Sequence, residues 1–122
     1  MGWKLNSDRQ IWLQLVEVLR MRIVTGQYPA GARMPSVREL AAEAGVNPNT
    51  MQRALSALEE SRLVSAVRST GRFVTQDEAL IAAAREKIAE EELDQFLVQM
   101  HQLGYDTDAI AQLIAKRRKK DE

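Results

Sequence analysis

Cysteine is absent from this chain of 122 residues, and histidine occurs only once. Without cysteine there is no disulfide framework and no thiolate metal site. The amino-terminal residues lack the apolar core of a signal peptide, and no hydrophobic run approaches transmembrane length. There is also no phosphate-binding loop, no nucleophile beside a placed base and no cluster of metal ligands. We therefore expect a cytoplasmic protein that is not an enzyme, holds no cofactor and has no membrane partner.

The net charge is zero, but the charges are unevenly distributed along the chain. Residues 1–76 hold 10 Lys and Arg against 6 Asp and Glu, a balance of +4, whereas residues 77–122 hold 7 against 11, a balance of −4. Hydrophobic residues make up 45% and charged residues 28%, which is the composition of a globular protein. A basic amino-terminal half suits a polyanionic partner, although the excess is modest.

Two short helices joined by a tight turn are predicted over residues 34–58. Ser36 and Glu39 have the spacing of a capping box, in which each side chain binds a backbone N–H of the other residue. Gly45 then stands where a helix C-cap needs a left-handed residue. Asn47 starts the second helix as its N-cap, because asparagine is a favoured cap and a proline follows at the first helical position. The pattern is that of a helix-turn-helix.

The second of these helices has an apolar face and a polar face. The apolar residues recur at the spacing of a buried stripe: Met51, Ala54, Leu55 and Leu58. The opposite face carries hydrogen-bonding side chains with one cation and no acid: Asn49, Thr50, Gln52, Arg53 and Ser56. Such side chains can read base edges or bind phosphates. The alternative is ordinary helix packing with a solvated outer face.

A β-hairpin is predicted directly after this helix, over residues 63–76. Gly71 is expected to supply the positive φ that the loop at residues 68–71 needs. A hairpin that follows a polar helix is the wing of a winged helix-turn-helix. Arg68 and Arg72 flank its tip and could reach phosphates, while the alternative is a charged edge that discourages strand aggregation.

A long first helix is predicted over residues 7–25, with a capping box at Ser7 and Gln10. Its apolar positions repeat every four residues, and Trp12 is interpreted as a core residue that widens the stripe. This helix completes a predicted winged helix-turn-helix domain at residues 1–76. The fold class is therefore mainly α with a small β-hairpin.

Two further helices are predicted at residues 77–104 and 107–118, the second capped by Thr107. Their apolar stripes are too long for a small winged domain to cover. A second copy of the chain could bury them in a four-helix arrangement, and docking onto the winged domain is the alternative. We predict a dimerisation segment at residues 77–122, with these residues at the interface: Ile81, Ile88, Phe96, Met100, Ile110, Leu113 and Ile114.

A family resemblance is carried by the run PAGARMPSVRELAAEAGVNPNTMQRALSALEESRLVSAVRSTGRFV. It resembles the amino-terminal domain of GntR-type bacterial transcription regulators, through the segment G-x-R-x-P-S-x-R-E-L, the turn G-V-N-P-N-T, the core A-L-x-x-L-E and the closing F-V. With the first helix, the resemblance covers about residues 8–75. The two-helix carboxyl-terminal part is similar to that of the YtrA-type subgroup, whose members carry a small helical dimerisation segment.

The resemblance implies a winged helix-turn-helix dimer that binds operator DNA, usually as a repressor. In the family, the arginine of the S-x-R-E-L stretch contacts DNA, which implies this role for Arg38. The turn and the start of the recognition helix also contact DNA, which implies the same for Asn47, Asn49 and Thr50. The wing glycine of the family corresponds to Gly71.

The chain departs from the family pattern at three positions that matter here. Pro48 and Gln52 stand where many relatives have a basic residue, so Arg53 is the cation that is left nearby. Arg62 stands where a glycine is common before the wing. These departures bear on the base contacts and the operator sequence rather than on the fold.

We therefore predict a sequence-specific, dimeric DNA-binding repressor that acts on an inverted-repeat operator in double-stranded DNA. A small-molecule effector of unknown identity would act by changing the spacing or mobility of the two wings. The predicted DNA contacts come from the helix pair and the wing: Arg38, Asn47, Asn49, Thr50, Gln52, Arg53, Arg68, Gly71 and Arg72.

Two other interpretations are open at this point. A winged-helix adaptor that binds proteins would not need its arginines on one surface, whereas a DNA-binding protein would gather Arg38, Arg53, Arg68 and Arg72. A metal site could include His101 and Asp94, which lie seven residues apart on roughly one helix face. A lone histidine on a helix is more often just partly buried, so we expect no metal.

Overall fold

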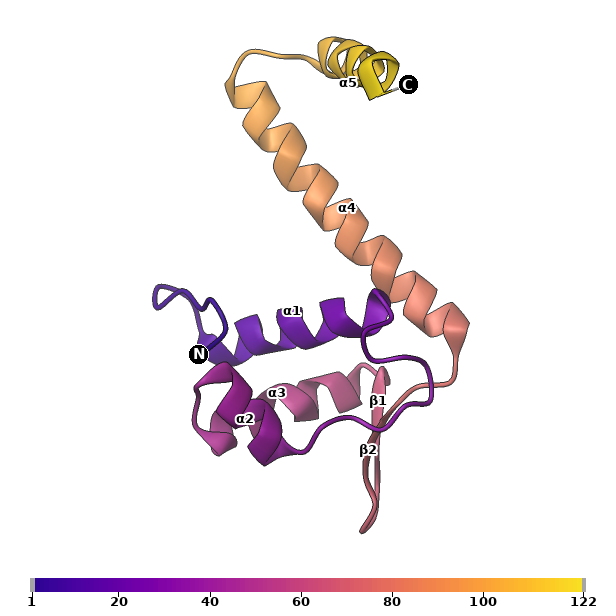
Figure 1. The fold of residues 1–122 in the computed structure, drawn as a ribbon. Helices are drawn as coiled ribbons and strands as arrows, with labels where there is room; N and C mark the ends of the chain where they lie inside the picture. The colour runs from indigo at the N-terminus through magenta and orange to yellow at the C-terminus, as the bar shows by residue number, and fades with distance from the viewer. Residues whose placement is uncertain (1, 122) are drawn as a thin grey trace. The chain divides into compact units, whose positions relative to one another are not determined.

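The computed structural model describes residues 2–121, which form five helices and one antiparallel hairpin (Figure 1). The fold is mainly helical with a small hairpin, as the sequence predicts. The elements in chain order are α1 (Ile11–Val24), α2 (Val37–Ala44), α3 (Pro48–Glu60), β1 (Val64–Val67), β2 (Gly71–Val74), α4 (Glu78–Gln102) and α5 (Thr107–Asp121).

The chain divides into two compact units, Met1–Arg85 and Glu86–Glu122, called here the winged unit and the helical unit. The predicted domain boundary after residue 76 lies just before α4, whereas the division between the units lies inside that helix. No helix within residues 2–121 has both the length and the apolarity to cross a membrane.

The core of the winged unit forms where α1, α2 and β1 pack against α3 (Figure 1). This central position of α3 explains why its apolar stripe is fully buried. Each such side chain contributes about 1.5–3 kcal/mol when it leaves water. The completely buried residues include Leu15, Leu19, Leu40, Met51, Leu55 and Leu58.

α1 begins four residues later than the sequence predicts, and the capping box predicted at Ser7 and Gln10 is wrong. Gln10 is the N-cap, but no side chain caps the helix. The cause is the buried side chain of Gln14, which accepts the backbone N–H of Asn6 at 2.7 Å and donates to its C=O at 2.6 Å. It also donates to the C=O of Arg9 at 3.1 Å. These bonds hold the preceding residues in a turn in place of a first helical turn.

The amino-terminal residues dock on the end of α2 through Trp3. Its backbone N–H donates to the C=O of Ala44 at 3.3 Å, and its indole N–H donates to Glu43 at 2.6 Å. The guanidinium of Arg22 lies 4.7 Å above the indole ring. Burial by itself would lower the pKa of Arg22, but its hydrogen bonds to Tyr28 and Glu43 outweigh that effect and raise the pKa above its ordinary value.

The α2–α3 pair has the caps that the sequence predicts. Ser36 and Glu39 form both bonds of the capping box, each at 3.1 Å. Gly45 is left-handed, with φ +75. The side-chain oxygen of Asn47 accepts the backbone N–H of Asn49 at 2.8 Å, which fixes the first turn of α3. Local capping thus sets both the turn and the start of the second helix.

The hairpin pairs β1 with β2 in the register Val64↔Val74 and Val67↔Gly71. Its tip is closed by the N–H of Thr70, which donates to the C=O of Val67 at 2.9 Å. The prediction that Gly71 has a positive φ is confirmed, at +121. The segment at residues 32–34 runs beside β2 and is joined to it by one isolated bridge.

Ile81 lies in the interior of the winged unit and not at the dimer interface where its spacing predicts it. It is 6% exposed and lines a hollow with Ile23 and Val24 of α1. One turn further along α4, Arg85 donates to the C=O of Val24 at 3.0 Å. The first turns of α4 are therefore part of this core, and the side chain of Ile81 is not available to a second copy.

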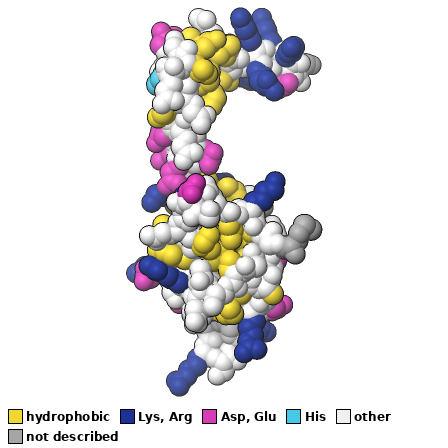
Figure 2. Space-filling model, turned by 90° about the vertical axis from the view of Figure 1, so that its left-hand side faces the viewer, with side chains coloured by type: hydrophobic (Ala, Val, Ile, Leu, Met, Phe, Trp, Pro, Cys, Tyr) yellow, Lys and Arg dark blue, Asp and Glu magenta, His cyan; other side chains and the backbone are white. Residues whose placement is uncertain are grey.

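The helical unit has few buried side chains. α5 begins at Thr107, but its cap is Asp106, whose side chain accepts the N–H of Ala109 at 2.8 Å, so the predicted Thr107 cap is wrong. Ile110 is 3% exposed and packs inside this unit. Figure 2 shows hydrophobic side chains uncovered over the α4–α5 end of the chain. The exposed ones are Leu93, Phe96, Val98, Leu103, Tyr105, Leu113 and Ile114.

Candidate nucleic-acid interface

The outward face of α3 presents the polar side chains that the sequence predicts. Asn49, Gln52 and Arg53 are exposed, whereas Thr50 and Ser56 are half-buried. Asn49 and Arg53 are four residues apart and therefore lie on one line of the helix. Because the opposite side of α3 is anchored in the core, this face is held rigidly outward.

Arg53 is held by an aromatic contact with α1. Its guanidinium carbon lies 4.3 Å from the centroid of the Trp12 ring. The indole N–H of Trp12 donates in turn to the side chain of Gln10 at 2.8 Å. The interpretation of Trp12 as a core residue is wrong, since its side chain is half-buried and lies beneath a surface arginine.

A hollow of about 760 Å³ lies between the start of α2 and the wing. It gathers three of the predicted DNA contacts, Arg38, Gly71 and Arg72, together with Arg33, which is not among the predicted contacts. Three arginines against one acid, Glu39, give the lining of this hollow an excess of positive charge, as a surface that binds phosphate groups requires.

Arg33 rests against Gly71. A Cβ atom on Gly71 would lie 3.2 Å from Nε of Arg33, so the missing side chain leaves room for the arginine. Hydrogen bonds to Ser36 lower the pKa of Glu39, and the charge of Arg33 lowers it further. The signal for Arg33 was present in the sequence, because it is the arginine of the G-x-R-x-P-S segment.

Arg72 is engaged within the fold. Its Nε donates to Glu59 in the last turn of α3 at 2.5 Å. The side chains of Arg72 and Glu59 are only 18% and 31% exposed. This ion pair ties the wing to α3, so a phosphate contact by Arg72 stays a prediction that must compete with Glu59.

The four arginines that distinguish a DNA-binding surface from an adaptor occupy three places in the winged unit. Arg38 and Arg72 share the hollow, as DNA binding predicts. Arg53 lies on α3 against Trp12, and Arg68 lies at the exposed tip of the hairpin. Arg38 and Arg72 therefore converge on one surface. A contact of Arg53 or Arg68 with DNA stays a prediction.

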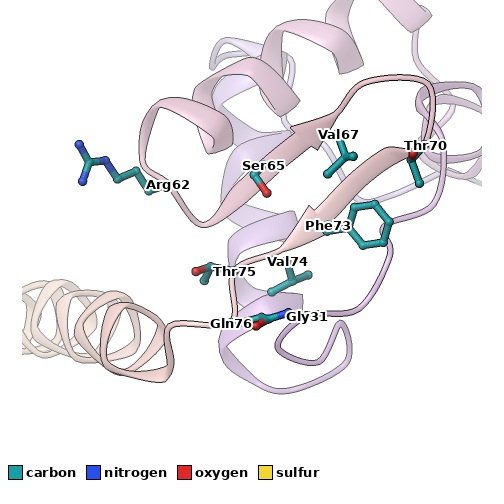
Figure 3. Close-up of a pocket in the computed structure, with 9 residues that line it drawn as sticks. All are labelled: Gly31, Arg62, Ser65, Val67, Thr70, Phe73, Val74, Thr75 and Gln76. Atoms are coloured by element: carbon teal, nitrogen blue, oxygen red, sulfur yellow. The ribbon is translucent and has the colours of Figure 1, made fainter.

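A second hollow, of about 420 Å³, lies along the hairpin and is shown in Figure 3. Arg62 is its one cation, and Figure 3 shows this side chain pointing away from the others. The remaining lining is small and uncharged: Gly31, Ser65, Val67, Thr70, Phe73, Val74, Thr75 and Gln76. Unlike the hollow at α2, this one does not gather cations.

The metal-binding alternative gains no support from the geometry. Within residues 2–121, no three His, Cys, Asp or Glu side chains are grouped so as to hold a metal ion. His101 is exposed near the end of α4, and Asp94 is exposed two turns earlier.

Comparisons with known proteins cover most of the chain. The family model for bacterial regulatory proteins of the gntR family matches residues 12–74. The uncharacterized HTH-type transcriptional regulator YhcF of Bacillus subtilis (strain 168) is 34% identical over 99 residues, which cover 81% of this chain and 82% of YhcF. The HTH-type transcriptional repressor YtrA of the same strain is 25% identical over 110 residues, covering 89% of this chain and 85% of YtrA.

The fold is also similar to solved structures. A GntR family transcriptional regulator from Listeria monocytogenes superposes with a TM-score of 0.84 and 37% sequence identity. The superposition covers 92% of this chain and 98% of that chain, so the similarity extends beyond the residues that the family model matches.

Proposed function

Because this chain belongs to the gntR family of bacterial regulatory proteins and is a DNA-binding transcriptional regulator, we propose that it acts as a dimeric repressor on an inverted-repeat operator. The observation that carries this proposal is the polar outward face of α3, which lies in the same compact unit as the arginine-lined hollow. YtrA, similar over 89% of this chain, is named a repressor, which supports the same direction of control here.

The proposed complex inserts α3 into the major groove with its amino-terminal end first. Asn49 and Gln52 are then nearest the base edges, where their amides suit adenine. The hollow at α2 receives the phosphate backbone through Arg38, and the wing tip brings Arg68 to a neighbouring phosphate. Base recognition and phosphate positioning are thus divided between α3 and its flanks.

The proposed dimer interface is the uncovered apolar surface of the helical unit. Phe96 is 40% exposed and Ile114 is 56% exposed, and contiguous apolar surface of this kind marks an interaction site. Ile81 and Ile110 are buried in their own units and are left out of the proposed interface. The remaining predicted residues form it: Ile88, Phe96, Met100, Leu113 and Ile114. A small-molecule effector would act through this unit, by changing the spacing of the two wings.

The experiment that tests the proposal is selection from random duplex DNA at physiological salt, followed by binding measurements on the selected site. We expect an inverted repeat with half-sites about one or two helical turns apart. Six to ten phosphate contacts per dimer would give a log–log salt slope of about −5 to −9. A slope near zero, with no repeat recovered, would contradict the proposal.

Two variants assign the roles of individual residues in the same assay. Asn49→Ala is expected to change base preference, whereas Arg38→Ala is expected to weaken binding to all sequences alike. His101→Ala, at an exposed position of α4 on the side away from the proposed dimer interface, is the control and should change neither property. If the Arg38 and Asn49 variants behave like this control, the assignment of α2 and α3 to the interface is wrong.

A further inference from the structure

We propose that Trp12 of α1 is a positioning residue for DNA binding, which holds Arg53 so that the edge of its guanidinium meets a phosphate while its face stays on the indole. Trp12 lies outside the helix-turn-helix, so this extends the interface to the start of α1. The inference rests on the proposed function, because it requires an operator complex.

The Trp12 ring is fixed from two sides. Its N–H is bound to Gln10, the residue that precedes α1, at 2.8 Å. Its backbone belongs to a helix whose next turns, at Leu15 and Leu19, are completely buried against the core. The ring therefore gives Arg53, on the neighbouring helix α3, a platform that does not move with the arginine side chain.

The chemistry of guanidinium allows both contacts at once. Its flat face stacks on an aromatic ring, while its five N–H groups lie in the plane and donate outward. A stacked arginine thus loses rotamer freedom before DNA arrives, and less entropy is lost when it binds a phosphate.

A second stacked arginine in the same unit shows what distinguishes Arg53. Arg22 lies over Trp3, but its Nη1 contacts the hydroxyl of Tyr28 at 2.7 Å and the carboxylate of Glu43 at 2.6 Å, and its side chain is only 19% exposed. Arg9 and Arg72 form ion pairs, as Arg22 does. Arg53 is exposed and is not among them, so its N–H edge is available to an anion.

The position of Arg53 on α3 favours phosphate over base. It lies one helical turn beyond Asn49 on the same line, further from the amino-terminal end that enters the groove first. Its contact with α1 holds it on the flank of α3. A phosphate group at the edge of the groove is therefore the partner that this geometry favours.

A double-mutant cycle on operator affinity tests the coupling. Arg53→Met should weaken binding about tenfold or more, as expected for loss of a charge-assisted bond. Trp12→Leu should weaken it about two- to fivefold. Trp12→Leu added to Arg53→Met should cost nothing further, because there is no guanidinium left to position. Full additivity would show that Trp12 is merely structural and would overturn the inference.

Two further variants separate the contribution of the aromatic ring to DNA affinity from that of the positive charge. Trp12→Phe keeps an aromatic face and should bind between wild type and Trp12→Leu. Arg53→Lys keeps the charge without the planar face, so the effect of Trp12→Leu should be smaller in that background than in wild type. Thermal unfolding of each variant, with melting temperatures close to wild type, ensures that affinity reports on the interface.

The salt dependence and base preference of Arg53→Met identify the DNA partner. Loss of a phosphate contact in each half-site should make the log–log slope shallower by about two per dimer, with base preference unchanged. A changed base preference at an unchanged slope would assign Arg53 to a base edge and overturn the phosphate contact.

Trp12 fluorescence tests whether the stack survives binding. The chain has two tryptophans, so Trp3→Phe leaves Trp12 as the single reporter. We expect acrylamide quenching of Trp12 to be higher in Arg53→Met than in the parent, and to stay low when the parent binds operator. A rise to the Arg53→Met level on binding would show that DNA removes Arg53 from the ring.

Two failures can be told apart. If the wild-type chain binds no duplex, both the proposed function and this inference are wrong. If it binds DNA but the double-mutant cycle is additive, only this inference is wrong.

Discussion

The winged unit and the helical unit use their apolar side chains in opposite ways. In the winged unit, Leu15, Leu19 and Leu55 are 0% exposed, whereas in the helical unit Leu103 is 71% exposed and Ile114 is 56% exposed. In the winged unit three elements, α1, α2 and β1, pack against α3, whereas the helical unit has only α5 and part of α4. Two helices cannot enclose a stripe that runs along both of them. The winged unit is therefore stabilised by its own core, whereas the helical unit leaves apolar side chains that the proposed dimer would cover.

The largest expected effect that tests this comparison is on stability. Leu55→Ala should lower the free energy of unfolding by about 3 kcal/mol, since it leaves a cavity in a core that cannot close over it. Leu113→Ala makes the same chemical change at a side chain that is 39% exposed in the helical unit, and it should cost less than about 1 kcal/mol at concentrations where the protein is monomeric. Urea denaturation measures both. Equal losses of unfolding free energy in the two variants would show that the two units do not differ in how they bury apolar side chains.

The next effect concerns association. Phe96→Asp combined with Ile114→Asp should convert a dimer to a monomer, because two charges cannot be buried against an apolar partner. Operator affinity should then fall about a hundredfold, or about 2.7 kcal/mol, as each half-site binds alone. Sedimentation velocity and operator titration measure the two outcomes. His101→Asp, at an exposed position on the side of α4 away from Phe96 and Ile88, is the matched control, and dimers that persist in the double variant would contradict the proposed interface.

A smaller effect of opposite sign is expected at Arg62. This residue has φ +70, a conformation that costs an L-amino acid with a side chain about 1–2 kcal/mol. Arg62→Gly should therefore raise the free energy of unfolding, by about 1 kcal/mol after the extra freedom of glycine in the unfolded chain is subtracted. Arg62→Ala keeps the conformational cost of the positive φ, so its free energy of unfolding should not rise. Stabilisation by alanine as well would assign the effect to the arginine side chain.

The smallest expected effect is on the pH dependence of folding stability, and it involves Glu39. Its bonds to Ser36, and then the charge of Arg33, lower the pKa of its carboxyl below the ordinary value of 4.5. Because the folded pKa lies below the unfolded one, the contribution of Glu39 is present above the ordinary pKa and is lost as the pH falls through the folded value. Urea midpoints measured through this acid range should therefore fall less steeply with acidification for Glu39→Gln than for wild type. Parallel curves would contradict the lowered pKa.

Local sequence signals predict local structure well in this chain. The capping box at Ser36 and Glu39, the left-handed Gly45 and the Asn47 cap all depend on neighbours within a few residues, and the structure confirms each. The positive φ at Gly71 belongs to the same class. The helix pair and the wing could therefore be placed from the sequence alone.

Contacts that helix periodicity does not encode account for the wrong predictions at α1, Trp12 and Ile81, and those at Trp12 and Ile81 come from segments far apart in sequence. The start of α1 is decided by Gln14, whose bonds to a preceding turn compete with helix formation. Trp12 has the spacing of a core residue, but Arg53 lies over it from another helix. Ile81 has the spacing of an interface residue on α4, yet α1 covers it. Periodicity identifies which face of a helix is apolar, but it does not identify what covers that face.

The ion pair between Glu59 and Arg72 has a consequence for how recognition can change. It joins positions 13 residues apart, one at the end of α3 and one in β2, with both side chains largely enclosed. The ion pair thereby holds the wing at a set distance from α3. If α3 reads the operator as proposed, substitutions on its outer side would alter the preferred bases without moving the wing, so that new operators would be reached one side chain at a time.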